Sequence, residues 1–111
     1  MDILFEDDRL RVACNDNRAA QKKWGQPSAR KLRSRLDDLA AAKTLDDVRN
    51  LPGRCHELVR DRKGQLAMDL HGALRLIFRP REAPPPVKQD GGLDWKKVES
   101  IVVVSVEDYH E

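Results

Sequence analysis

The chain has 111 residues, of which 40% are hydrophobic and 36% are charged, and its formal net charge is +2. This length supports one folded domain with a modest core, which we expect to span residues 1–111, and the apolar content is too high for a disordered chain. No apolar run approaches the roughly 20 residues that a membrane span needs, and the acidic amino terminus lacks the basic start of a secretory signal, so we expect a cytoplasmic protein without membrane contact.

Basic residues are concentrated in two segments. Residues 9–35 hold nine Lys or Arg against one Asp, and residues 54–81 hold seven against three acidic residues. Residues 82–111 reverse this balance, with three basic against seven acidic residues. Concentrated positive charge is typical of a surface that binds a polyanion, although a solvated helix face is the commoner cause.

The first half of the chain predicts a short strand followed by two to three helices. Ile3–Phe5 is a brief apolar run, and the acidic residues behind it suit the start of a helix. Helical spacing then continues to Trp24, with an interruption at residues 15–17. The strongest helix is expected from Ser28 to Ala42, because apolar residues recur there on one face and basic residues occupy much of the rest.

The second half has the alternating pattern of a sheet. Gly-containing turns at residues 63–64 and 71–72 predict that three successive strands are antiparallel, and residues 80–93 form a proline-rich exposed loop. The sequence therefore predicts an α+β fold with a mainly antiparallel sheet. The four strands expected after the helices are Cys55–Val59, Leu66–Leu70, Leu74–Phe78 and Val98–Val106.

A polar tail follows directly behind the last expected strand. Asp108, Tyr109 and His110 can together orient, donate and accept protons, and a strand end is a place where such groups meet a ligand. A second histidine, His56, lies within the basic segment 54–81. Histidine beside arginine suggests chemistry on a phosphate.

Four motifs, taken in this order and spacing, carry a resemblance to a known family. They are Arg49-Asn50-Leu51-Pro52-Gly53 leading into Cys55-His56-Glu57-Leu58, then Asp61-Arg62-Lys63-Gly64, Leu74-Arg75-Leu76-Ile77-Phe78, and Asp108-Tyr109-His110. The chain resembles the small RelE/ParE-superfamily toxins of bacterial toxin–antitoxin pairs, especially the HigB-like killer proteins. That resemblance implies a compact RelE-like α+β fold, in which a curved sheet packs on amino-terminal helices. Where relatives carry a lysine and a glycine before the second motif, this chain has Val59 and Arg60.

The resemblance also implies an activity and partners. HigB-like members are ribosome-dependent endoribonucleases that cleave messenger RNA, and cleavage of this kind needs no metal or other cofactor. The expected partners are the ribosome, messenger RNA and a cognate HigA-like antitoxin with a helix-turn-helix, through which promoter DNA is contacted only indirectly. Two alternatives stay open on the same fold: a non-enzymatic ParE-like toxin that binds DNA gyrase, and an inactive relative kept as a regulatory partner.

The residues expected to act on RNA fall into two groups. By resemblance, His56 and His110 transfer protons, Asp108 orients an imidazole and Tyr109 contacts phosphate or a base; which histidine is the base stays open. Arg75 lies within an apolar strand, so it either reaches a functional surface or pairs with a carboxylate such as Asp69. The expected phosphate ligands are Arg54, Arg60, Arg62, Lys63 and Arg79, with Arg30, Lys31 and Arg33 on the basic helix.

Cysteine chemistry and metal binding are not expected. Cys14 and Cys55 are too few for a disulfide framework and lack metal-ligand spacing, so we expect small core residues in a reducing compartment. Cys55 adjoins His56, but adjacent residues of a strand point to opposite faces and would not form a catalytic pair.

Overall fold

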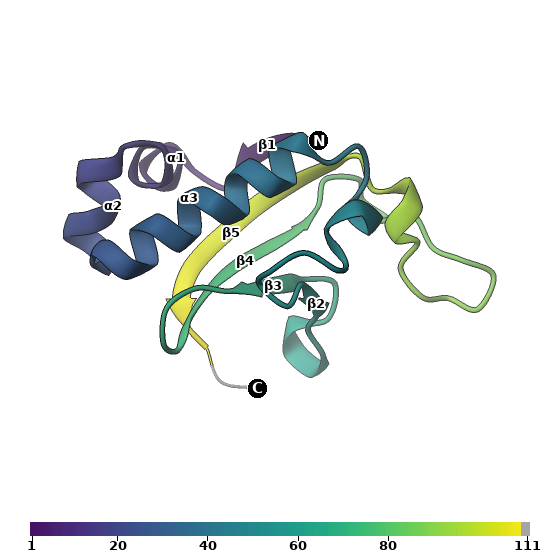
Figure 1. Ribbon diagram of the computed structural model, residues 1–111. Helices are drawn as coiled ribbons and strands as arrows, with labels where there is room; N and C mark the ends of the chain where they lie inside the picture. The colour runs from purple at the N-terminus through teal and green to yellow at the C-terminus, as the bar shows by residue number, and fades with distance from the viewer. Residues whose placement is uncertain (110–111) are drawn as a thin grey trace.

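The computed structural model describes residues 1–109 and shows three helices packed on a five-stranded sheet (Figure 1). The strands are β1 (Asp2–Phe5), β2 (His56–Glu57), β3 (Leu66–Asp69), β4 (Leu74–Pro80) and β5 (Ser100–Asp108). The helices are α1 (Asp8–Asn15), α2 (Asn17–Trp24) and α3 (Gln26–Ala41), with 3-10 turns η1 (Leu45–Val48), η2 (Arg60–Arg62) and η3 (Trp95–Lys97). The predicted α+β class is confirmed.

The strands lie in the order β1-β5-β4-β3-β2. β2, β3, β4 and β5 pair antiparallel to one another, as predicted, and the short amino-terminal strand joins this sheet beside β5 in parallel. A parallel pair needs a long connection, and here the chain between β1 and β5 supplies it with the three helices and the strands β2, β3 and β4. The sheet therefore has one strand more than the four that follow the helices in sequence.

Capping explains where the helices begin and end. The side chain of Asp16 accepts a hydrogen bond of 3.1 Å from the backbone N–H of Ala19, so the predicted interruption is a cap between α1 and α2. α3 begins at Gln26, two residues before the expected Ser28, because proline is compatible with a first helical turn. None of the described helices is long and apolar enough to span a membrane.

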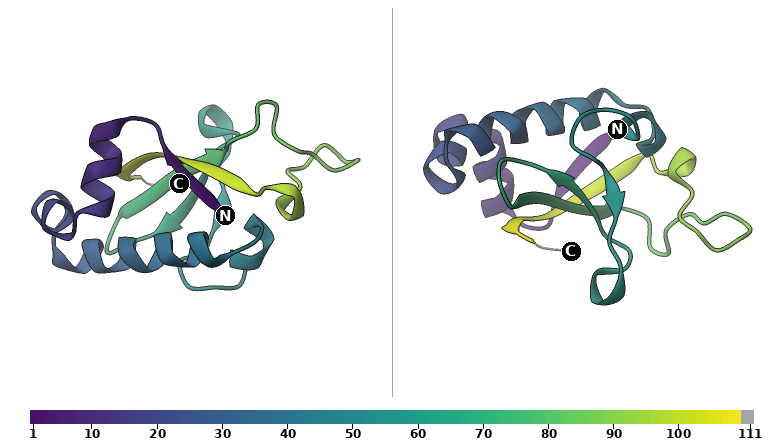
Figure 2. Two further views of the ribbon diagram at one scale, coloured as in Figure 1. Left: turned by 90° about the horizontal axis from the view of Figure 1, so that it is seen from above. Right: turned by 60° about the horizontal axis from the view of Figure 1, so that its bottom comes forward.

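The two faces of the sheet have different surroundings. The helices form a layer on one face, here called the covered face: α1 and α3 contact the sheet, and α2 packs mainly on α1 and α3. The core between the helices and the sheet is formed by residues such as Leu36, Leu76 and Phe78. The opposite face, here called the open face, has η2 and the end of β5 beside it (Figure 2). A smaller apolar cluster of Leu58, Ala67 and Ile77 lies there. Alternation along the strands sends neighbouring side chains to these two environments.

Two features of the predicted sheet differ in the structure: β2 is shorter than expected, and the connection between β2 and β3 is longer. β2 has two residues rather than the five expected, because the chain turns into η2 at Arg60, which has a φ of +59°. The β2–β3 connection is wider than a tight hairpin at residues 63–64, and the Leu58 N–H donates to the Gln65 carbonyl at 2.9 Å. The proline-rich loop between β4 and η3 projects from the body of the molecule, as expected for an exposed loop (Figure 1).

Candidate functional site

Strand register places four chemistry-bearing residues on the open face. His56 pairs with Ala67 in β3, and Asp69, two residues further along β3, therefore lies on the same face. Arg75 of β4 pairs with Asp69, and Glu107 of β5 pairs with Arg75. Segments far apart in sequence thus supply one surface.

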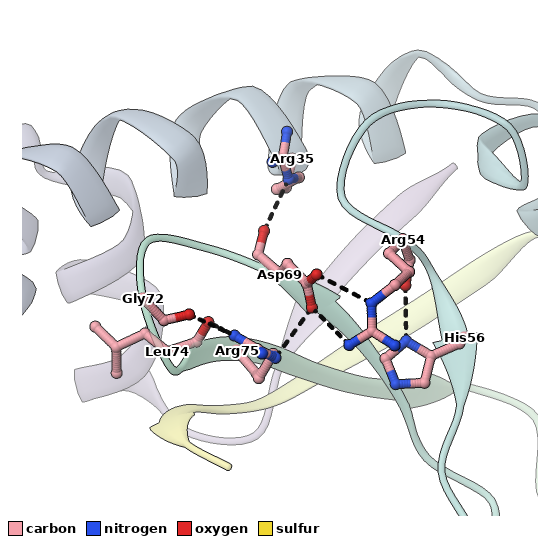
Figure 3. Close-up of polar contacts among 7 residues, drawn as sticks. All are labelled: Arg35, Arg54, His56, Asp69, Gly72, Leu74 and Arg75. Atoms are coloured by element: carbon pink, nitrogen blue, oxygen red, sulfur yellow. Dashed lines mark hydrogen bonds and ion pairs between the residues drawn. The ribbon is translucent and has the colours of Figure 1, made fainter. Parts of the chain in front are cut away.

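The carboxylate of Asp69 holds two arginines on this face (Figure 3). Arg54 donates from Nε to Oδ2 at 3.1 Å and from Nη2 to Oδ1 at 3.2 Å. Arg75 Nε lies 3.0 Å from Oδ1 as an ion pair without hydrogen-bond geometry. Its Nη1 donates to the carbonyls of Gly72 and Leu74, each at 2.9 Å. The pairing expected as one alternative for Arg75 is therefore present, and Asp69 brings two guanidinium groups together on this face.

The ionisation of Asp69 reflects these contacts. Burial of Asp69 raises its pKa, but hydrogen bonds and positive charge from Arg54, together with the charge of Arg75, outweigh burial and leave the pKa below the ordinary aspartate value. The carboxylate is consequently charged at neutral pH, as an anchor for two guanidinium groups must be.

A strained loop delivers Arg54 and His56 to the site. Gly53 and Arg54 have φ values of +112° and +50°, the left-handed region that glycine adopts readily and arginine does not. A Cβ on residue 53 would lie 2.6 Å from Nε of Arg35, so the close approach of the Arg35 side chain to this backbone also requires glycine. Arg35 Nε donates to the Asp69 carbonyl at 3.0 Å, and the Asp69 N–H donates to the Gly53 carbonyl at 2.7 Å. Arg35 therefore braces the site from α3, a role that nothing in the sequence indicated.

The contact made by His56 defines its tautomer. Its Nδ1 lies 2.7 Å from the backbone carbonyl of Arg54 (Figure 3). Because a carbonyl can only accept, Nδ1 carries the hydrogen, and in the neutral imidazole the lone pair is then on Nε2. The half-buried ring is thus oriented by the same loop residue that binds Asp69.

The end of β5 contacts η2 on the open face. Arg62 pairs with Glu107, with Nη2 and Oε1 2.5 Å apart, and its guanidinium lies 5.2 Å from the centre of the Tyr109 ring. Tyr109 packs against the apolar cluster of the open face, whereas Asp108 is exposed. His110, expected to transfer a proton, lies outside the described residues. Glu107 was not among the expected residues, although its spacing of two from Tyr109 is a signal for a shared face.

The remaining expected ligands are dispersed. Arg60 and Lys63 are exposed in the β2–β3 connection, and Arg79 on the open face lies 3.8 Å from Glu6. The left-handed backbone of Arg60 gives a physical reason for the glycine that the resemblance expects there. The exposed basic residues of α3 belong to the helical layer and are not brought together with His56; they are Arg30, Lys31 and Arg33.

The cysteines are buried, as expected. Cys14 and Cys55 both belong to the covered-face core, and burial raises the pKa of their thiols to about 11 and about 12, respectively. Cys55 thus lies on the face opposite to His56, which confirms that the two do not form a pair. Among the described residues, no group of three or more His, Cys, Asp or Glu side chains is arranged to hold a metal ion.

The fold is similar to solved bacterial toxins. No protein-family model matches the sequence, and no curated protein matches it either. A YoeB/ParE toxin from Agrobacterium tumefaciens superposes with a TM-score of 0.57 at 11% identity, covering 99% of this chain and 100% of the toxin. A YoeB dimer from Staphylococcus aureus gives a TM-score of 0.54 at 15% identity, covering 100% of this chain and 98% of its own. At such low identity the likeness is one of architecture, and this chain therefore has the fold of the YoeB/ParE toxins.

Proposed function

We propose that this protein is the toxin of a toxin–antitoxin pair and that it cleaves messenger RNA on the ribosome without a metal ion. The observation that carries the proposal is the open face, where His56, Arg54, Arg75 and Tyr109 share one side of a YoeB/ParE-like sheet. Such a surface can meet a flexible polymer, because the helical layer lies on the other side of the sheet (Figure 1).

Proton transfer is the first task of such a site. Cleavage of RNA begins when a base removes the proton of the 2′-hydroxyl, whose oxygen then attacks the neighbouring phosphorus. His56 suits the base, because its Nδ1 hydrogen is held by the Arg54 carbonyl and the neutral ring therefore accepts through Nε2. By resemblance, His110 then protonates the departing 5′-oxygen, with Asp108 as its orienting carboxylate.

Charge stabilisation is the second task. The phosphate gains negative charge as the new bond forms, and guanidinium groups stabilise it through two-point hydrogen bonds. Arg54 and Arg75 are suited to this role, because Asp69 holds both guanidinium groups on the open face. Tyr109 contributes a ring and a hydroxyl for contact with a base or phosphate.

The proposed partners follow from charge and from the resemblance. The exposed basic residues of α3 offer a surface for ribosomal RNA, which would leave the open face for the message. A HigA-like antitoxin with a helix-turn-helix neutralises the toxin and carries the pair to promoter DNA. We place this activity in the cytoplasm, where ribosomes translate.

The decisive experiment adds the purified protein to translating ribosomes and maps the ends of the message. We expect new ends with the wild type and a loss of about 10²- to 10⁴-fold in cleavage rate for His56→Gln, the range for removing a general base. His71→Gln is the matched control, because His71 is an exposed histidine in the β3–β4 turn. Cleavage by His56→Gln at the wild-type rate would contradict the assignment. Intact messages together with growth arrest would favour the gyrase-binding alternative. Intact messages without growth arrest would favour the inactive relative.

The strained backbone of Arg60 offers a second test of RNA binding. A left-handed conformation costs a non-glycine residue roughly 1–2 kcal/mol, so Arg60→Gly should raise the free energy of unfolding by up to about 1 kcal/mol once the flexibility of glycine is counted. If Arg60 binds phosphate, the same variant cleaves with a higher KM. A more stable variant with an unchanged KM would exclude Arg60 from the substrate contact.

A further inference from the structure

Arg62 and Glu107 form an ion pair across 45 residues of sequence, at the point where η2 meets the end of β5. Arg62 Nη2 lies 2.5 Å from Oε1, and its Nη1 donates to Oε2 at 3.4 Å and to Gln65 Oε1 at 3.3 Å. The hydroxyl of Ser105 also donates to Glu107 Oε2. The two charged side chains are only 27% and 32% exposed. This pair is therefore more enclosed and more fully hydrogen-bonded than a typical surface ion pair.

Contacts with Arg62, with the apolar cluster of the open face and with the Ala73 carbonyl place Tyr109 beside this pair. The Arg62 guanidinium lies 5.2 Å from the centre of the Tyr109 ring, within the range of a cation–π interaction. The ring also packs against the apolar cluster of Leu58, Ala67 and Ile77. The Tyr109 N–H donates to the Ala73 carbonyl at 3.2 Å, just beyond the last paired residue of β5. Since β5 ends at Asp108, side-chain contacts rather than further strand pairing hold the ring.

Glu107 has no expected contact with RNA, yet it determines where the guanidinium of Arg62 lies. Both terminal nitrogens of Arg62 are directed at Glu107, which fixes the plane of the guanidinium beside the ring. The hydrogen bond from Arg62 also lowers the pKa of Glu107 below the ordinary glutamate value, although burial opposes it. The pair therefore persists at neutral pH.

We propose that Glu107 and Arg62 are positioning residues that hold Tyr109 in place on the open face. The inference rests on the proposed function, in which Tyr109 meets the RNA, and it assigns a task to a glutamate outside the expected site. Arg62 then acts through Tyr109 rather than by binding a phosphate itself. Removal of Arg62 leaves the apolar cluster and the backbone hydrogen bond of Tyr109, and removal of Glu107 releases the guanidinium of Arg62 from its fixed plane. In either variant the orientation of the ring becomes heterogeneous.

Fluorine NMR can test the position of the ring directly. The chain contains one tyrosine, so the full-length protein labelled with fluorotyrosine gives a single site to observe. Glu107→Gln and Arg62→Lys should both move or broaden this resonance toward that of the denatured protein. The double charge reversal Arg62→Glu with Glu107→Arg should return it part of the way. Asp8→Asn breaks the exposed Arg11–Asp8 pair of α1 and should leave the resonance unchanged.

Cleavage on ribosomes then tests whether the position matters. We expect kcat to fall about 10- to 100-fold in Glu107→Gln with a smaller change in KM, the size expected when a catalytic contact is misplaced. Partial recovery in the charge-reversed double variant separates positioning from loss of fold, which tryptophan fluorescence monitors independently.

The two measurements separate failure of this inference from failure of the proposed function. An unchanged resonance in both single variants overturns the inference, whatever the activity. A shifted resonance with wild-type kcat also overturns it, because the ring's position would then have no consequence. If the wild-type protein cleaves no message, the proposed function fails, and the consequence for cleavage inferred for this pair fails with it, whereas the resonance still reports whether the pair positions the ring.

Discussion

Strand β4 shows both environments of the sheet within a single element. Leu76 and Phe78 point to the covered face and are fully buried against helical residues, whereas Arg75 and Arg79 point to the open face. Between these arginines lies Ile77, which is also fully buried but belongs to the small cluster with Leu58 and Ala67. The covered face therefore provides most of the core, and the open face presents charged side chains around a small apolar cluster.

The comparison shows how a small domain can bury most of its core on one face of a sheet and still present charged side chains on the other. Burial of apolar area drives folding, and the larger buried cluster lies on the covered face. On the open face the charges are held mainly by one another: Asp69 holds Arg54 and Arg75, while Glu107 holds Arg62. Changes on the two faces should consequently have separable effects on stability and activity.

The largest effect is expected from the core of the covered face. Phe78→Ala should lower the free energy of unfolding by about 3–5 kcal/mol, the usual cost of removing a fully buried aromatic side chain. Ile77→Ala, one residue earlier on the opposite face, should cost less, about 2–3 kcal/mol, because its cluster is smaller and relaxes more readily. Urea unfolding at constant m-value measures both. A larger loss for Ile77→Ala would show that the open-face cluster is the principal core.

The loop that delivers Arg54 and His56 should show an intermediate effect. Gly53→Ala should cost about 2–3 kcal/mol, because it combines a left-handed backbone with a Cβ that would collide with Arg35. Gly64→Ala is the matched control: its φ is +96°, but no atom lies within 4 Å of the added Cβ, so about 1 kcal/mol is expected from the backbone alone. Thermal unfolding compares the two. Equal losses would mean that the contact with Arg35 contributes nothing.

The smallest effect on stability is expected from lowering the pH, which protonates Asp69. The folded-state pKa of Asp69 is lowered, so its contribution to stability is fully present above the unfolded pKa of about 4 and is lost as the pH falls through the folded value. The stability difference between the wild type and Asp69→Asn should therefore be constant near neutral pH and shrink below about pH 4. Urea unfolding from pH 7 to pH 3 gives the curve. A difference that grows toward low pH would have the wrong sign for an ion-paired carboxylate.

Much of the architecture could be predicted from local pattern. The α+β order of elements, the antiparallel strands and the buried cysteines all follow from periodicity, capping residues and glycine positions. The predicted ends of strands and helices were less accurate where the backbone conformation of a single residue overrides the pattern of apolar residues. β2 is short because Arg60 adopts a left-handed conformation, and α3 starts early because Pro27 is acceptable in a first helical turn.

The candidate site was only partly accessible to sequence reasoning. His56, Arg75 and Tyr109 were expected because residue type and the family resemblance single them out. Arg35 and Glu107 were not expected, since their roles depend on contacts 34 and 45 residues away in sequence. A charged residue on a helix or strand carries no local signal that identifies such a distant partner.

The amino-acid sequence by itself determined which residues alternate between apolar and polar surroundings, because that alternation is a property of each strand. Tertiary structure alone decided which polar residues meet, because strand pairing aligns β3, β4 and β5, and the register shift between Ile77 and Phe78 sets which residues of β5 lie opposite β4. Register and crossover geometry are collective properties of the packed sheet. They place Asp69 between two arginines and Tyr109 beside Arg62, and no local pattern contains that information.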